Sequence, residues 1–210
     1  MPGQQSTGGD FTFGKSYAVL HLDLMTCLID AVANTSEGKA FVSNCVRWNE
    51  AVHKKDPQPP TIFTSLFFNP GEPELAVDAP FTRLLQDFGP FAVGTPPVQI
   101  SSHFATQEKD IVLQKTRWYA GAGNNLEQIL RARNIDTVIL SGLSLSGVVM
   151  STVYRLFDLD YTVYVISDNV LELPPHHHQE YSQVLLRSLM PKMNLKVISI
   201  EQALGALERS

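Results

Sequence analysis

Short apolar runs rich in β-branched and aromatic residues alternate along this chain with longer amphipathic segments. The runs that we expect to form strands are residues 17–23, 61–67, 110–115, 137–141, 161–167 and 195–199. Alternation of this kind is typical of βα units that feed a parallel sheet covered on both faces. The pattern therefore predicts an α/β fold, a three-layer α/β/α arrangement with a six-stranded, mainly parallel Rossmann-like sheet.

The segments between these runs carry helical periodicity. In residues 36–55, four apolar side chains recur every three or four positions and would form one buried stripe: Phe41, Cys45, Trp48 and Val52. Further helices are expected over residues 124–134, 146–159, 176–189 and 200–207. No internal repeat interrupts this order.

Residues 69–106 break the alternation, because this segment is dense in proline. Proline fixes the backbone without joining a sheet, so the segment predicts irregular structure with one helix over residues 81–88. An insertion at this place would lie above the strand ends, where α/β proteins bind ligands. We expect it to form a wall of a pocket.

Length and charge limit the class of partner. A chain of 210 residues suits a single domain over residues 1–210, in which the Gly-, Gln- and Ser-rich start suggests a flexible tail over residues 1–14. The formal charge of −5 argues against nucleic acid and anionic membrane as partners, since both need a concentrated basic surface. A small-molecule substrate is the expected ligand.

Targeting signals and cysteines indicate the compartment. No apolar run approaches the roughly 20 residues that cross a bilayer, and the first ten residues lack the features of a signal peptide. The two cysteines, Cys27 and Cys45, are too few for a disulfide framework and are expected to be reduced. We therefore expect a cytoplasmic protein.

Three polar features fall where the predicted strands end. Asp23 ends the first strand, Lys115 ends the third, and the fourth leads into the turn 141–147 (SGLSLSG) before a helix. In parallel sheets the carboxyl ends of the strands form the edge at which reactive groups gather. A carboxylate there needs a partner, and Lys115 is the candidate for Asp23. The pair fits either a structural ion pair or a catalytic one.

The order of these features resembles the isochorismatase-like (cysteine hydrolase) superfamily. The resemblance covers residues 17 to about 204 and rests on YAVLHLDLM, DIVLQKTRWYAGAGNNLEQIL and TVILSGLSLSGVVMSTVYRLFDLDYTVYVISD. It implies that Asp23 and Lys115 are catalytic, the acid moving a proton and the lysine polarising the site. It also implies a homodimer or a higher homo-oligomer.

In that family a cysteine follows the signature glycine by six positions and attacks the substrate carbonyl. Counting from Gly142 places Val148 there, so the chain resembles a divergent member that lacks the nucleophile. Isochorismatases within the family do not need the thiol, because hydrolysis of a vinyl ether can begin with proton donation from the aspartic acid. Ser144 stands where they carry tyrosine, which argues against isochorismate itself.

Other residues near these motifs are candidates for binding a substrate. Ser144, Ser146 and Val148 lie in or after the turn, and Ser144 and Ser146 also suit turn and N-cap roles. Trp118 and Tyr119 follow the lysine and would either stack on an apolar ligand or cover the sheet.

The segment after the second strand reads FFNPGEPEL and contributes Phe67 and Asn69 as further candidate binding residues. Metal-binding members of the family carry an Asp-x-His pattern at this place, and it is missing here. We therefore predict no metal and no cofactor. The run His176-His177-His178 opens a predicted helix and is expected to be a solvated cluster, since consecutive helical residues point in different directions.

The sequence thus favours an enzyme of secondary metabolism that performs cysteine-independent acid–base chemistry on a small, largely apolar metabolite. The reaction class stays open between hydrolysis, isomerisation and cyclisation. One alternative is a catalytically inactive binding or scaffold protein. Another is a conventional amidohydrolase that uses Cys27.

Overall fold

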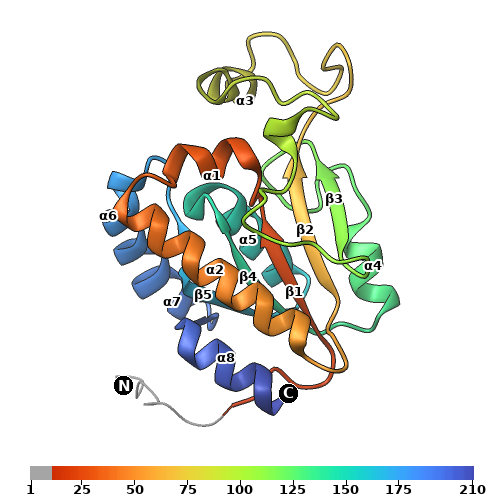
Figure 1. Ribbon diagram of the computed structural model, residues 1–210, viewed down its shortest axis with the longest axis vertical. Coiled ribbons are helices and arrows are strands. Elements are labelled where there is room, and N and C mark those ends of the chain that lie inside the picture. The colour runs from red at the N-terminus through yellow and green to blue at the C-terminus, as the bar shows by residue number, and fades with distance from the viewer. Residues whose placement is uncertain (1–10) are drawn as a thin grey trace.

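The computed structural model describes residues 11–210 and contains one sheet of six parallel strands in the order β3-β2-β1-β4-β5-β6. The strands are β1 (Tyr17–Leu22), β2 (Thr61–Leu66), β3 (Ile111–Lys115), β4 (Thr137–Leu143), β5 (Thr162–Leu171) and β6 (Lys196–Ile198). Helices flank the sheet on both sides (Figure 1). This arrangement confirms the predicted three-layer α/β/α class.

The central strands explain why the sequence pattern was so clear. Every residue of β1, β2 and β4 is buried, since these strands lie inside the sheet and are covered on both faces. The edge strands β3 and β6 are partly exposed, as their outer sides have no neighbouring strand.

The helices are α1 (Thr26–Val32), α2 (Ser36–Lys54), α3 (Pro80–Leu85), α4 (Leu126–Ala132), α5 (Met150–Asp158), α6 (His178–Val184), α7 (Met190–Lys192) and α8 (Ile200–Arg209). Short 3₁₀ turns are η1 (Gln86–Phe88), η2 (Pro96–Val98) and η4 (Pro175–His177). Two π-helical turns, η3 (Leu145–Val149) and η5 (Leu185–Leu189), precede α5 and α7. The helix expected over 176–189 is therefore divided, and α1 is an addition to the predicted set.

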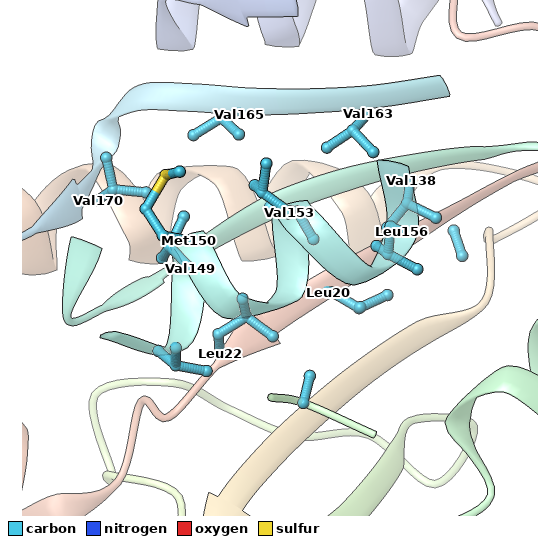
Figure 2. Packing of buried hydrophobic residues seen from close by; sticks show 14 of the residues in the cluster. Leu20, Leu22, Val138, Val149, Met150, Val153, Leu156, Val163, Val165 and Val170 are labelled. Atoms are coloured by element: carbon cyan, nitrogen blue, oxygen red, sulfur yellow. The ribbon is translucent and has the colours of Figure 1, made fainter. Parts of the chain in front are cut away.

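Two apolar layers hold the helices to the sheet. Helices α2 and α8 cover the near face in Figure 1, where Trp48 packs with Val19 and Ile139. On the other face, α5 turns its apolar stripe toward the strands, and Figure 2 shows Val153 and Leu156 among the strand residues of β1, β4 and β5. Burial of such side chains is the main stabilising term of the fold.

The proline-dense segment rises beyond the ends of β2 and β3, with α3 at the top of Figure 1. Two of its side chains, Leu85 and Phe91, are buried in a cluster with Leu66 and Leu143 from the strand ends. The segment is therefore anchored over the carboxyl edge of the sheet, as expected for a pocket wall.

The start of the chain was expected to be a flexible tail over 1–14. Residues 1–10 lie outside the described residues, whereas Phe13 is buried and packs against the rings of Trp48, Tyr17 and Tyr164. Within residues 11–210, no helix combines the length and apolar character needed to cross a membrane.

Candidate functional site

Asp23 and Lys115 meet at the carboxyl edge of the sheet. The Lys115 ammonium lies 2.7 Å from Oδ2 of Asp23. Their strands are separated by β2, and Thr64 of β2 donates a hydrogen bond of 2.8 Å to Oδ1 of Asp23. Asp23 directly follows β1 with a φ of +56°, a conformation uncommon outside glycine. The predicted pairing of strand ends is therefore realised in the structure.

Both charged groups are removed from water. The side chain of Lys115 is 0% exposed and that of Asp23 is 6% exposed. The Lys115 ammonium also donates to the carbonyl oxygen of Arg117 at 2.9 Å, which gives the buried cation a second acceptor. Burial raises the pKa of Asp23 above its ordinary value, and the Lys115 charge and the hydrogen bonds from Lys115 and Thr64 oppose that rise.

A cavity of about 200 Å³ opens next to Asp23. Its walls are mostly apolar and come from α1, β2, the α3–η1 segment and the strand ends. They comprise Leu28, Leu66, Leu84, Leu85, Phe88, Phe91, Trp118, Leu143, Val148 and Leu173. Four polar residues also line it: Asp23, Ser144, Ser146 and Glu172. Such a concave, largely apolar site with a few polar groups is the usual form of a small-molecule pocket.

The turn between β4 and α5 forms one side of the cavity. It contains a cis peptide bond between Leu143 and Ser144 and continues into the π-helical turn η3. Gly147 lies where a Cβ atom would come within 2.6 Å of the Ser144 hydroxyl and 3.2 Å of the Trp118 ring. The absence of a side chain at this position allows Trp118 to lie close to the turn.

Five of the predicted site residues come together at this cavity: Asp23, Trp118, Ser144, Ser146 and Val148. Lys115 does not line the cavity but forms an ion pair with Asp23, which does. Val148 is 1% exposed and also belongs to the core cluster beneath α5, so its side chain serves both the wall and the core. No polar atom is available on this side chain.

Three predicted binding residues do not line the cavity. Side chains alternate along a strand, so Leu66 faces the cavity whereas Phe67 lies by a separate hollow with Val98 and Val112. Asn69 instead donates to the Glu74 carboxylate at 2.6 Å. Neither residue is among those that line the cavity, and a role of either in binding stays a prediction.

Tyr119 is the third residue outside the cavity. Its hydroxyl donates to the Glu127 carboxylate at 2.9 Å, and Arg155 holds the same carboxylate from α5. Burial and this hydrogen bond raise the pKa of Tyr119. The Tyr119 hydroxyl therefore connects to α4 and, through Glu127, to α5.

Glu172 is a cavity residue that sequence reasoning missed. It follows the end of β5, which runs four residues past the strand predicted over 161–167. Its carboxylate accepts a hydrogen bond of 2.7 Å from the Ser146 amide and one of 2.9 Å from the Leu173 amide. In the sequence, Glu172 lies in a segment that was expected to be a loop before Pro174 and Pro175. No feature of that segment predicts that its side chain reaches the turn before α5.

Neither cysteine has the surroundings of an activated nucleophile. Burial raises the pKa of Cys27 to about 11, and its side chain is absent from the cavity lining within residues 11–210. Cys45 is fully buried in the stripe of α2, and burial raises the pKa of its thiol. Reactive cysteines have a lowered pKa, whereas the pKa of both of these thiols is raised.

The histidine run is not uniformly solvated as predicted. His178 is half-buried, and its Nδ1 accepts a hydrogen bond of 3.2 Å from the Glu172 amide. His177 lies 3.9 Å from the Glu180 carboxylate, and His176 is exposed. Across the described part of the chain, no group of three or more His, Cys, Asp or Glu side chains is arranged to hold a metal ion.

Comparison with solved structures returns the same fold. An isochorismatase family protein from Burkholderia thailandensis has a TM-score of 0.77 and 22% sequence identity, covering 95% of this chain and 100% of that chain. N-carbamoylsarcosine amidase from Thermoplasma acidophilum has a TM-score of 0.69 and 21% identity, covering 89% and 98%. At these identities the likeness establishes the fold alone.

Comparison with curated sequences and with a protein-family model identifies the family. The chain is 30% identical over 100 residues to the uncharacterized isochorismatase family protein YecD of Escherichia coli O157:H7, which is 48% of this chain and 50% of that protein. The chain thus spans about half the length of this curated relative. The sequence model of the isochorismatase domain matches residues 17–202, which include both the Asp23–Lys115 pair and the turn before α5. This chain belongs to the isochorismatase family.

Proposed function

We propose that this protein is an enzyme that performs acid–base chemistry at Asp23 on a small, largely apolar molecule, without a covalent enzyme intermediate. The observation that supports the proposal best is the buried Asp23–Lys115 pair at the edge of an apolar cavity. The reaction would be a hydrolysis, an isomerisation or a cyclisation. Each of these can proceed by proton transfer to and from a bound substrate.

Asp23 would carry the proton. Burial raises the pKa of this carboxyl, which makes the protonated form more available near neutral pH than for an ordinary aspartic acid. Lys115 would stabilise the carboxylate once the proton has moved, and Thr64 would hold its orientation through Oδ1. A positioned group of this kind contributes a factor of about 10² to 10⁴ to the rate.

The surroundings of the cysteines support a mechanism without a thiol. Val148 has no nucleophilic atom and lines the cavity where the turn enters α5. The raised pKa of Cys27 keeps it a protonated thiol at neutral pH. The Thermoplasma relative is described as an amidase. If this chain also cleaves amides, we propose that Asp23 activates a water molecule for the attack.

A screen of a small-molecule library by mass spectrometry tests the proposal. We expect the wild-type protein to convert at least one apolar compound, and D23N to lose that turnover by about 10² or more. E50Q is the matched control, because Glu50 is an exposed carboxylate on α2 whose ion pair with Lys54 lies at the surface. Full turnover by D23N would overturn the proposal. Loss of turnover on alkylation of Cys27 would favour the amidohydrolase alternative.

A second candidate is an inactive binding or scaffold protein. It is favoured by Val148 in the cavity wall, which has no nucleophilic atom, and by the Glu172 carboxylate, which occupies the Ser146 amide. In that case Asp23 and Lys115 form a structural ion pair. Ligands would then bind without any turnover, and K115M would bind them as the wild type does.

We also propose a cytoplasmic homodimer or higher homo-oligomer that acts on its substrate without nucleic acid or membrane. Apolar side chains stay exposed on α5 and α6, among them Phe157 at 43% and Val184 at 59%. Exposed apolar area of this kind is typical of protein interfaces. Light scattering on the purified chain measures the assembly, and a monomeric mass would exclude the oligomer.

A further inference from the structure

The cavity contains a second carboxylate whose charge has no partner cation. Glu172 is 2% exposed, yet it lines the same cavity as Asp23. Its Oε2 accepts from the Ser146 amide at 2.7 Å, and its Oε1 accepts from the Leu173 amide at 2.9 Å. Both oxygens act as acceptors, which is the hydrogen-bonding pattern of an ionised carboxylate.

The two carboxylates of the cavity therefore differ in net charge. Lys115 neutralises Asp23. Among residues 11–210, Glu172 takes part in no ion pair with lysine, arginine or histidine. The nearby His178 accepts the Glu172 amide hydrogen bond through Nδ1, so this nitrogen carries no proton and the ring is neutral. Burial lowers the pKa of the ring, and the Glu172 and Glu37 charges oppose that shift. When Asp23 is ionised and paired with Lys115, the Glu172 carboxylate is therefore the one charged group lining the cavity, among residues 11–210, without an ion-pair partner.

Position adds to this charge preference. The Glu172 carboxylate takes up the Ser146 amide at the start of the turn before α5, where backbone N–H groups would otherwise attract an anion. A negatively charged ligand would meet that carboxylate in a site of low dielectric, in which like charges repel strongly. A positively charged group on a ligand would instead gain an unneutralised partner.

We propose that this cavity selects small ligands that join a cationic head, such as a protonated amine, to an apolar or aromatic body. The head lies against the Glu172 carboxylate. The body lies among the rings of Trp118, Phe88 and Phe91, which also line the cavity. The inference deepens the proposed function in that it places the ligand in the same cavity, but it does not depend on turnover.

Three probes of matched size and different charge test it: benzylamine, benzyl alcohol and benzoate, titrated calorimetrically into the full chain at pH 7 and low salt. We expect benzylamine to bind about tenfold or more tightly than benzyl alcohol, the usual gain from a hydrogen bond to a charged group, and benzoate to bind most weakly. Equal affinities, a preference for benzoate, or no binding of any probe at millimolar concentration would overturn the inference.

Two variants assign the preference to Glu172. E172Q removes the charge, so benzylamine and benzyl alcohol should bind it with similar affinity. Because a glutamine cannot accept both amide hydrogen bonds with its two terminal atoms, the second variant is F88K, which supplies a cation from a cavity residue that is 37% exposed. F88K should also remove the preference. A preference that persists in both variants would show that Glu172 is not its source.

The outcomes separate this inference from the proposed function. D23N/K115M removes the ion pair and should keep the preference for benzylamine, since Glu172 is unchanged. Turnover that depends on Asp23 without an amine preference would overturn the inference alone. An amine preference without any turnover would overturn the proposed enzyme and leave the charge selection supported.

Discussion

The Lys115 ammonium lies 2.7 Å from the Asp23 carboxylate, and neither side chain is more than 6% exposed. Removing two charges from water is costly, and their attraction repays that cost only when both are present. The same ion pair therefore contributes both to the stability of the fold and to the candidate site. A variant designed to test chemistry at Asp23 also tests stability.

Removal of one partner is expected to destabilise the fold more than removal of both. D23N leaves the buried Lys115 ammonium without its counter-charge, so we expect its free energy of unfolding to fall by about 3–5 kcal/mol. D23N/K115M replaces the pair with neutral groups and should recover most of that loss. Urea unfolding of the wild type, D23N and D23N/K115M measures these free energies. Equal stability of D23N and D23N/K115M would show that the Lys115 charge does not depend on Asp23 for its stability in the fold.

A thiol placed at Val148 should be a poor nucleophile while Glu172 is charged. The V148C thiol would share a cavity with that carboxylate, which raises the pKa of the thiol and slows alkylation. We expect V148C/E172Q to react with iodoacetamide about tenfold faster, the effect of roughly one pKa unit. Both variants are made with C27S, so that Cys27 does not contribute. Equal rates would mean that Glu172 does not act on this position.

Most of the fold could be predicted because the central strands are buried along their whole length and are rich in β-branched and aromatic residues. The C-terminal part of β5 could not be predicted, because the polar residues Asp168 and Asn169 are typical of a loop. In the structure these polar side chains form hydrogen bonds to neighbouring helices: Asp168 accepts from the Ile200 amide at 2.7 Å, and Asn169 donates to the Asn44 carbonyl at 3.3 Å. Tertiary contacts of this kind override local propensity. α1 was missed because it is only seven residues long and has no side-chain cap.

The candidate site was predictable to the extent that it follows strand ends. Asp23 and Lys115 were found because each closes an apolar run and parallel strands bring such ends together. Glu172 was missed because its position depends on the unpredicted extension of β5. Phe67 and Tyr119 lie outside the cavity although Leu66 and Trp118, their neighbours in sequence, line it. Adjacent residues point in different directions, so proximity in sequence to a site residue does not bring a side chain into the cavity.

Acid is expected to unfold the protein partly through His21. Burial, with a smaller contribution from His53, lowers the pKa of His21 from 6.5 to about 3. Below pH 6.5 the His21 side chain is therefore protonated in the unfolded chain but stays neutral in the folded chain. The contribution of His21 to the free energy of unfolding is present above pH 6.5 and is lost as the pH falls toward 3. The loss approaches about 1.4 kcal/mol per pH unit for this one group.

H21F removes the titrating ring and keeps an aromatic contact with Phe63, whose ring centroid lies 4.6 Å from that of His21. Its unfolding free energy, measured in urea between pH 7 and pH 4, should fall less steeply than that of the wild type. H103F is the matched change at an exposed histidine. An unaltered slope in H21F would show that the acid sensitivity arises at other groups.

Gly142 is expected to be the glycine least tolerant of substitution near the site. It pairs with Leu22 between β4 and β1, one residue before Asp23, and an added Cβ would come within 2.4 Å of the Leu22 carbonyl oxygen and 2.5 Å of its Cβ. Backbone atoms cannot move aside cheaply, so G142A must push the strands apart. We expect a loss of about 1–3 kcal/mol or more in the free energy of unfolding, together with displacement of Asp23 and weaker ligand binding.

G205A in α8 is the control, because its Cβ meets only the end of the Arg209 side chain and alanine favours the helix by up to about 1 kcal/mol. Thermal unfolding of both variants decides the point, since a G142A protein as stable as G205A would mean that the strands have room that the structure does not show.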